Sequence, residues 1–203
     1  MRPAPPALGA LMLTANLASA AALDPGIAAR FAEVSIPAPT PSDLVLCHGF
    51  GCKYRTEIAL NADDRAQLAR LLAAGRASPA AERRAVGLAV AWFERRAAPQ
   101  AGTAKAVARA GPRWSGDPSQ FDCIDASTNT TEVLLLLDEL KLLRHHAVRG
   151  PSSRISLHGI VTFHSTAVLA ERRGGRKWAV DSWTKRNGEV PDIQPLAAWM
   201  VAK

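Results

Sequence analysis

Apolar and polar residues alternate along a short stretch near the start of the folded chain. In residues 53–60, one face carries Tyr54, Thr56, Ile58 and Leu60, and the other carries Lys53, Arg55 and Glu57. A period of two predicts a β-strand, and the apolar run at 43–47 predicts a second strand beside it. Because the four letters HGFG lie between the two runs, we expect a hairpin with a four-residue loop.

Further along the chain, the apolar period becomes that of an α-helix. Asn61 can cap a helix that runs to about residue 74, and Ser78 followed by Pro79 predicts the start of a second helix. The apolar stripe expected on this second helix consists of Ala85, Leu88, Ala89, Trp92 and Phe93. Residues 97–120 then form a long connection of Gly, Pro and small residues, and such a connection within a domain usually has a function.

A third helix is predicted over residues 122–143, and it is apolar on more than one face, so we expect it to be central. Two strands follow a Gly-Pro break near residue 150, one at about 155–169, with room for an interruption, and the other at 177–183. This order of strands, helices and strands predicts a single α+β domain over 43–203. Ahead of it, we expect 21–42 to be an extended, Pro-rich segment without a core of its own.

The first twenty residues have the pattern of a signal peptide. Arg2, an apolar stretch and a small-residue triplet ending at Ala20 predict export with cleavage after Ala20. An uncleaved anchor is the alternative, but the apolar run is shorter than the ~20 residues that a spanning helix needs. No other stretch is long and apolar enough to cross a bilayer. We therefore expect a periplasmic or secreted protein with no transmembrane segment after cleavage.

Composition and charge add few constraints. The chain has 203 residues, of which 48% are hydrophobic and 21% charged, which suits one folded core and excludes wholesale disorder. Its formal net charge is +7. The basic residues are spread along the chain without interleaved aromatics, so we expect a solvated basic surface and no specific nucleic-acid partner.

The three cysteines divide into a pair and a single thiol. Cys47 and Cys52 flank the predicted hairpin loop, and residues that face each other across a ladder have Cα atoms about 5.5 Å apart, within disulfide range. In an oxidising compartment this pairing leaves Cys123 free. We expect no metal site and no cofactor, because the histidines lack a ligand spacing with other donors and the cysteine pair lacks a fourth ligand.

Cys123 opens the predicted central helix, where the free N–H groups and the helix dipole are expected to stabilise a thiolate. His164 on one strand and Asp181 on the next supply an imidazole and a carboxylate, the base and the orienting group of a catalytic triad. Whether they meet depends on the strand register. A loop over 171–174 puts them directly opposite each other, whereas a Gly174-Gly175 turn puts Lys185 opposite His164, and we favour the first.

The run DCID at a helix start, followed by His and then Asp on neighbouring strands, resembles the transglutaminase-like cysteine peptidase superfamily. It is nearest to the bacterial transglutaminase-like cysteine proteinases, and the resemblance covers about residues 110–185. It implies a papain-like α+β fold in which the helix that carries Cys123 packs on an antiparallel sheet. It also implies that Cys123 is the nucleophile, His164 the general base and acid, and Asp181 the group that orients the imidazole. The letters CHGFGC and DCIDASTNTT also resemble exported bacterial proteins of unassigned function.

Two residues near the thiol are candidates for supporting roles. Gln120 or the backbone N–H of Cys123 could supply an oxyanion hole, and Asp125 is expected to cap the first helical turn and bond loop N–H groups. The sequence thus predicts an exported thiol hydrolase, a peptidase or amidase, or an acyltransferase, acting on a protein or peptide of the cell envelope through an acyl-thioester. The alternative is a non-catalytic envelope module that keeps the fold and binds a partner with the surface around 97–120.

Overall fold

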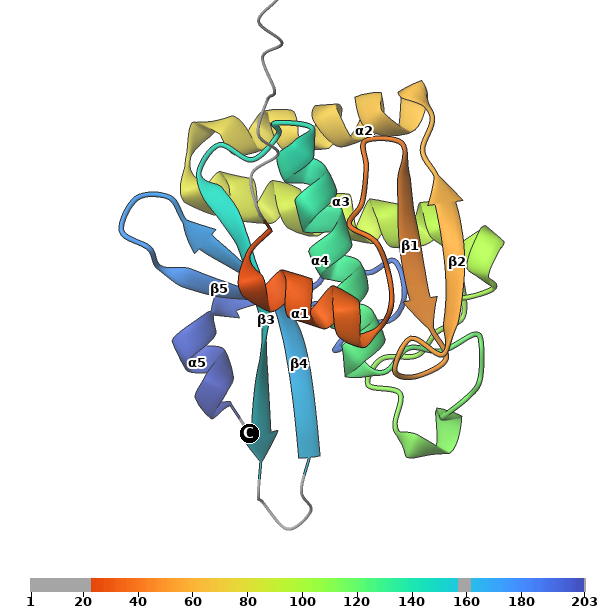
Figure 1. Cartoon of the computed structure of the whole chain (residues 1–203). Helices are drawn as coiled ribbons and strands as arrows, with labels where there is room; N and C mark the ends of the chain where they lie inside the picture. The colour runs from red at the N-terminus through yellow and green to blue at the C-terminus, as the bar shows by residue number, and fades with distance from the viewer. Residues whose placement is uncertain (1–22, 157–161, 203) are drawn as a thin grey trace, which may run out of the picture.

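The chain folds into helices and two antiparallel sheets, as the computed structural model shows for residues 23–156 and 162–202 (Figure 1). One sheet has two strands and the other has four. The expected α+β class is therefore confirmed. The predicted signal peptide, residues 1–20, and His158 lie outside the described residues.

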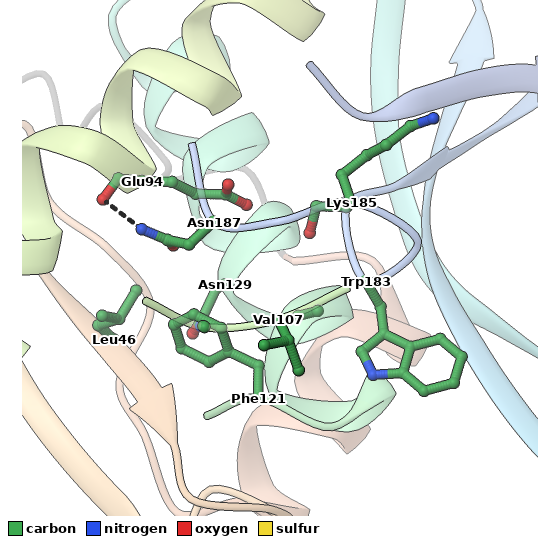
Figure 2. A pocket seen from close by; sticks show the side chains of 11 residues that line it. Leu46, Glu94, Val107, Phe121, Asn129, Trp183, Lys185 and Asn187 are labelled. Atoms are coloured by element: carbon green, nitrogen blue, oxygen red, sulfur yellow. Dashed lines mark hydrogen bonds between the residues drawn. The ribbon is translucent and has the colours of Figure 1, made fainter. Parts of the chain in front are cut away.

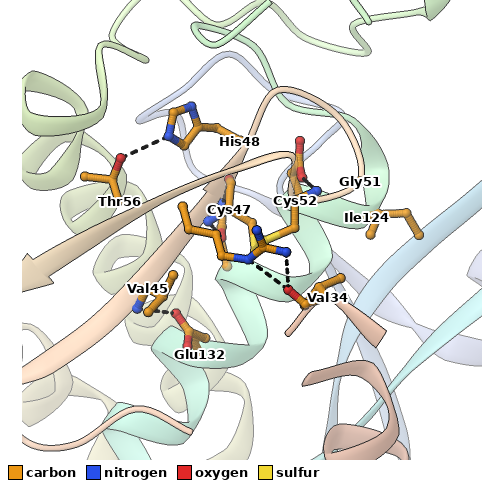
Figure 3. Close-up of a disulfide and its surroundings, with 12 residues drawn as sticks. Val34, Val45, Cys47, His48, Gly51, Cys52, Thr56, Ile124 and Glu132 are labelled. Atoms are coloured by element: carbon orange, nitrogen blue, oxygen red, sulfur yellow. Dashed lines mark hydrogen bonds between the residues drawn. A yellow bond between two sulfur atoms is a disulfide. The ribbon is translucent and has the colours of Figure 1, made fainter. Parts of the chain in front are cut away.

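The N-terminal hairpin consists of β1 (Asp43–His48) and β2 (Tyr54–Ala59), close to the predicted strands. Cys47 and Cys52 form the expected disulfide, with their Cα atoms 4.5 Å apart (Figure 3). The ladder differs from the expectation, because Cys47 pairs with Arg55 and Cys52 lies in the loop. The disulfide therefore closes the loop itself and does not bridge two facing strand residues.

Residues 21–42 are not extended throughout, contrary to the expectation, since they contain α1 (Pro25–Glu33). The side chain of Asp24 caps this helix, and a proline occupies its first position, where the missing N–H does no harm. Ile27 and Phe31, one turn apart, are buried. The Pro-rich run at 37–42 favours an extended chain. The Asp24-Pro25 start signal and the spacing of Ile27 and Phe31 favour a helix before it.

Two helices begin at the predicted caps. They are α2 (Ala62–Ala73), which follows Asn61, and α3 (Pro79–Ala101), which follows Ser78. In each case the cap side chain accepts a hydrogen bond from the backbone N–H three residues later, at 2.9 and 3.2 Å. A short 3-10 turn, η1 (Ala74–Ala77), joins the two helices. Local capping chemistry thus set both starts, as the sequence indicates.

The buried face and the end of α3 differ from the expectation. Leu88 is 48% exposed, whereas Val86 and Val90 are buried. The helix also continues to Ala101 and ends where Gly102 adopts a left-handed conformation with φ 72°. The long connection therefore begins after Ala101 and not at the predicted residue 97. It contains a second 3-10 turn, η2 (Pro112–Trp114).

The central helix is α4 (Cys123–Glu139), which begins as predicted and ends four residues before the predicted 143. In Figure 1 it runs between the hairpin and the larger sheet. Asn129 holds the backbone of β1 with both atoms of its amide, accepting from Cys47 N at 2.7 Å and donating to Cys47 O at 2.8 Å. Glu132 accepts from Val45 N at 2.9 Å. Side chains of α4 thus satisfy the strand edge that β2 leaves unpaired.

The larger sheet is antiparallel, with strands in sequence order, and a short helix follows its last strand. Its elements are β3 (His146–Ser156), β4 (Thr162–Glu171), β5 (Lys177–Asp181), β6 (Asp192–Pro195) and α5 (Leu196–Val201). The predicted strand at about 155–169 corresponds to the end of β3 and most of β4, and the earlier part of β3 was not predicted as a strand. The Gly150-Pro151 pair does not break β3, because it lies at a register shift in an edge strand, where a missing N–H is tolerated. Within the described ranges, no helix has the length and apolarity needed to cross a membrane.

Candidate active site

Cys123 is the first residue of α4, and Asp122 caps the helix directly before it. The Cys123 Sγ lies 3.8 Å from the carbonyl oxygen of Phe163 in β4. This point of β4 lies beyond its last residue pair with β5, Ala167 with Val180. The start of the central helix therefore brings the thiol to the part of β4 that β5 no longer covers, next to His164.

His164 and Asp181 meet, although not in the predicted register. The pairing of Ala167 with Val180, carried one residue further, puts Asp181 opposite Thr166 and two places from His164. Diagonal neighbours of this kind remain within reach of long side chains. The His164 Nε2–H donates to Asp181 Oδ2 at 2.6 Å. The expectation of direct opposition is wrong because the loop spans 172–175, but the contact itself is present.

Two tryptophans hold this pair, and the sequence analysis missed both. The imidazole of His164 lies between the rings of Trp183 and Trp199, with centroid distances of 4.7 and 5.2 Å. Trp199 Nε1 also donates to Asp181 Oδ2 at 2.8 Å. No spacing signal pointed to Trp199, because it lies on the short α5 and reaches the site only through the fold. Trp183, two residues after Asp181, could have been found from its closeness to the carboxylate in sequence.

The His164 and Asp181 side chains are buried, and each keeps one unused polar atom. Among the described residues, no hydrogen bond reaches His164 Nδ1 or Asp181 Oδ1. Because His164 Nε2–H donates to the carboxylate, Nδ1 carries the lone pair that can accept a proton. Buried polar atoms are usually satisfied in folded proteins, so this unused imidazole nitrogen, one residue along β4 from the carbonyl that the thiol contacts, is a feature of chemical interest.

The environment of Cys123 keeps its thiol protonated. The pKa of the thiol is raised to about 11, mainly by burial and also by the carboxylates of Asp122 and Asp181, while the backbone N–H groups of Ser165 and Cys123 act in the opposite direction. The expected stabilisation of a thiolate by the helix start is therefore outweighed. The side chain is only 7% exposed, and the helix N-terminus cannot replace the water that the thiolate would lose.

Asp122 and Asp125 join the helix start to the disulfide loop. Asp125 accepts hydrogen bonds from Phe50 N at 2.7 Å and Cys52 N at 2.6 Å, and Asp122 accepts from Gly51 N at 3.0 Å. Asp125 thus makes the loop contacts that were expected of it. Burial raises the pKa of both carboxyl groups, and the neighbouring charge of Asp122 raises that of Asp125 further.

The backbone of the disulfide loop turns its N–H groups toward these carboxylates. Residues 49–52 all have positive φ, from 56° to 82°. Such a run of left-handed conformations favours glycine, and two of the four positions are glycines. The disulfide holds the other residues of the run in place, so this loop fixes the end of α4 that carries Cys123 (Figure 3).

Gln120 anchors the long connection. Among the described residues, none of its hydrogen bonds goes to Cys123. Its Oε1 accepts from Val107 N at 2.9 Å, its Nε2 donates to Ser119 Oγ at 3.2 Å, and its carbonyl accepts from Gly49 N at 2.8 Å. The structure therefore ties Gln120 to the loops on either side. Of the two oxyanion donors suggested by the sequence, the backbone N–H of Cys123 is the better placed, because a first helical residue has no intrahelical partner for it.

Trp183, whose ring packs against His164, also lines a cavity. Figure 2 shows this cavity with Trp183 at its edge. Figure 2 shows Glu94 and Asn187 across this cavity from Phe121 and Trp183. Burial raises the pKa of Glu94 to about 7, although Gly188 N donates to its Oε2 at 2.7 Å. The cavity therefore has one carboxyl group that titrates near neutral pH.

Comparisons with known proteins find no match for this chain among family models, curated proteins or solved structures. The transglutaminase-like resemblance therefore rests on the residues themselves. In the part of the chain that the structure describes, no group of three or more His, Cys, Asp and Glu side chains is arranged to hold a metal ion. His145 and His146 make hydrogen bonds within the fold instead, to Arg76 O and Glu82.

Proposed function

We propose that this protein is a thiol hydrolase or acyltransferase that acts on an amide bond, with a transglutaminase-like arrangement of Cys123, His164 and Asp181. The observation that supports it is the state of the imidazole. Asp181 holds its Nε2, while its Nδ1 has no partner among the described residues, and the thiol contacts the residue just before it in β4. A thiol, a base with a free nitrogen and an orienting carboxylate are the groups that nucleophilic catalysis requires.

The protonated thiol decides the first step of this mechanism. Since the pKa of Cys123 is about 11, the thiol cannot act as a preformed thiolate at neutral pH. We propose that Cys123 Sγ attacks the amide carbonyl while its proton passes to His164 Nδ1. This requires the thiol to turn from Phe163 O toward the imidazole, as catalytic hydrogen bonds often form only with substrate bound.

The later steps use the same groups. Asp181 stabilises the imidazolium, and the backbone N–H of Cys123 donates to the oxyanion. His164 Nδ1–H then protonates the leaving amine as the C–N bond breaks, which leaves an acyl-thioester on Sγ. Attack of water or of an amine, with its proton again taken by His164, releases a carboxylic acid or a new amide and restores the thiol.

A second function, a non-catalytic binding module, is favoured by the closure of the site. Cys123, His164 and Asp181 are exposed by only 7%, 8% and 2%, and the thiol has a raised pKa. A buried thiol with these properties is typical of a structural cysteine. In that case the fold would serve to present the long connection to a partner.

Alkylation of the folded protein distinguishes the two functions. If His164 acts as the base, iodoacetamide should label Cys123 at pH 7 more than ~10²-fold faster in the wild type than in His164→Gln, because general-base assistance contributes ~10²–10⁴-fold. If Cys123 is structural, both proteins should remain unlabelled until the pH approaches the thiol pKa of about 11. Cys123→Ala controls for the site of labelling, and circular dichroism confirms that each variant is folded.

We also propose that the protein is exported and acts on a protein or peptide of the cell envelope. The disulfide between Cys47 and Cys52 supports an oxidising compartment. Mass analysis of the protein from a periplasmic fraction should give a chain that begins at residue 21. Recovery of the full-length chain from the cytosol alone would contradict export without affecting the chemistry of the site.

A further inference from the structure

The long connection between α3 and α4 forms an open hollow beside the candidate site. Its lining residues run from Val107 to Trp114 and include Arg109, Pro112 and Arg113. Val107 also lines the cavity next to Trp183, and Arg109 N donates to Trp183 O at 2.8 Å. In Figure 1 this connection lies beside the turn of the β1–β2 hairpin, at the end of α4 where Cys123 lies. The hollow is therefore tied by its backbone to Trp183, whose ring packs against His164 at a centroid distance of 4.7 Å.

The two positive charges in this hollow are not neutralised by an ion pair among the described residues, although the charge of Arg109 helps to lower the pKa of Asp192. Arg109 and Arg113 are exposed, and neither forms an ion pair with any carboxylate of the described residues. No acidic residue lines the hollow. The two nearby carboxylates are engaged elsewhere, since Asp117 accepts from Ser119, and Asp192 pairs with Lys185 at 2.8 Å.

The aromatic and apolar surface of the hollow adds a second type of contact. The guanidinium of Arg113 lies 5.5 Å from the ring centre of Trp114, and Val107 is 36% exposed. A flat ring next to two guanidinium groups can bind carboxylates and the methylene groups that carry them. One tryptophan does not make the series of stacking platforms by which proteins bind single-stranded nucleic acid.

The hollow is also held in shape before any ligand arrives. Val107 N donates to Gln120 Oε1 at 2.9 Å, and Ala106 O accepts from Asn187 N at 3.2 Å. Arg109 has a φ of 53°, and its bond to Trp183 O fixes that conformation. A backbone fixed in this way loses little entropy on binding, which favours affinity.

We propose that this hollow binds an acidic segment of a polypeptide, through Arg109, Arg113 and Trp114. If the proposed thiol chemistry also holds, this acidic segment is the part of the substrate that flanks the reacting amide. This identification of the segment with the substrate rests on the proposed function. Charge complementarity selects the ligand, and the bond from Arg109 N to Trp183 O places the hollow next to the tryptophan that packs against His164.

Fluorescence anisotropy with the Cys123→Ala protein tests the proposal without any turnover. The probes are labelled peptides of equal length, rich in Glu, Gln or Lys, and an oligodeoxynucleotide with the same charge as the Glu peptide. Only the Glu peptide should bind well, and added salt should weaken it. The double variant Arg109→Gln/Arg113→Gln should weaken this binding about tenfold, because two charge pairs with the peptide are lost.

The matched control, Arg172→Gln/Arg173→Gln on the turn between β4 and β5, removes the same charge far from the hollow and should change the affinity less than about twofold. Equal losses in the two double variants would overturn the proposal, as would equal binding of the Gln peptide or of the oligonucleotide. Thiol labelling of the wild type is measured in parallel. If Cys123 is never labelled but the Glu peptide still binds as described, the inference stands and the proposed chemistry fails.

Discussion

The described residues include two buried pairs of a histidine and a carboxylate, and the surroundings of these two pairs differ. Glu82 Oε1 lies 2.8 Å from His146 Nδ1, and Asp181 Oδ2 lies 2.6 Å from His164 Nε2. All four side chains are at most 10% exposed. Distance and burial alone therefore do not distinguish the pair at the candidate site from the other.

The Glu82–His146 pair uses all of its hydrogen-bonding capacity. Glu82 accepts from the backbone N–H groups of Arg144, His145 and His146 at 2.7 to 3.1 Å, and the second nitrogen of His146 faces Arg83 Nη1 at 3.2 Å. Burial alone would raise the pKa of Glu82, but these hydrogen bonds outweigh it and hold the pKa below its usual value. Such a pair ties α3 to the start of β3 and has no atom left for chemistry.

The Asp181–His164 pair keeps one atom free on each partner. Asp181 receives hydrogen bonds only at Oδ2, from His164 and Trp199, and His164 Nδ1 has no partner in the described chain. The difference shows that unused hydrogen-bonding capacity, more than the presence of a His–carboxylate contact, marks a site that can accept a proton. The following predictions separate the two pairs, beginning with the largest effect.

Glu82→Gln should lower the free energy of unfolding by about 3–5 kcal/mol, because it breaks a buried charged pair and turns an amide N–H₂ toward backbone donors. The matched change Asp181→Asn should cost less than about 1.5 kcal/mol, since it leaves fewer donors without an acceptor. Urea unfolding followed by circular dichroism measures both values. Equal costs for the two variants would mean that the pairs do not differ in the way described.

Labelling of Cys123 should respond in the opposite order. Asp181→Asn should slow alkylation at pH 7 by about 10²-fold or more, because the charge that stabilises the imidazolium is gone. Glu82→Gln should leave the rate per folded molecule unchanged. Residual reactivity should rise from Cys123→Ala through His164→Ala to Asp181→Ala, in the order of nucleophile, base and orienting group. A slower rate in Glu82→Gln would show that both pairs act on the thiol.

Trp199→Phe should slow the same reaction about tenfold and change its pH dependence, because one hydrogen bond to a charged carboxylate is lost while the ring remains. Trp178→Phe is the control, since Trp178 Nε1 donates to the carboxylate of Glu171 at 3.0 Å, away from the site. A labelling rate profile against pH should therefore shift for Trp199→Phe only. A shift of the same size in both variants would indicate a general loss of stability.

The sequence predicted well those features that depend on neighbouring residues. Asn61 and Ser78 cap helices where expected, because a cap is formed by one side chain and the N–H three residues later. The start of α4 was predicted to within one residue, and its cap is Asp122. The start of α1 had the same local signal at Asp24, which the prolines further along obscured. Gly150-Pro151 was misread because only the sheet order shows that β3 is an edge strand.

The sequence could predict which residues form the candidate site, but not the pKa of its thiol or the contacts that surround it. Cys123, His164 and Asp181 follow from residue type and order, and the fold brings the last two together. Their register depends on a loop whose length the sequence left ambiguous. The raised pKa of Cys123 and the bond from Trp199 depend on distant parts of the chain that cover the site, so no local pattern could reveal them.

A third buried carboxyl group, that of Glu94, shows how the number of hydrogen-bond donors to a carboxylate affects its pKa. It receives hydrogen bonds from Gly188 N and the Ser182 hydroxyl, fewer than Glu82 receives, and burial raises its pKa from 4.5 to about 7. Below pH 4.5 it is protonated in both the folded and the unfolded state. As the pH rises toward 7, the unfolded chain loses this proton first, so the fold loses stability.

Glu94→Gln should remove that loss. Its unfolding free energy should equal that of the wild type near pH 4 and exceed it by about 1–2 kcal/mol at pH 8, since the amide cannot ionise and can still accept from Gly188 N. Glu82→Gln should show the opposite sign. The lowered pKa of Glu82 contributes stability above pH 4.5 that is lost on acidification, so this variant should be most harmful at pH 8. Urea unfolding at both pH values measures the two differences. If they had the same sign, the number of donors would not decide which buried carboxylate the fold stabilises.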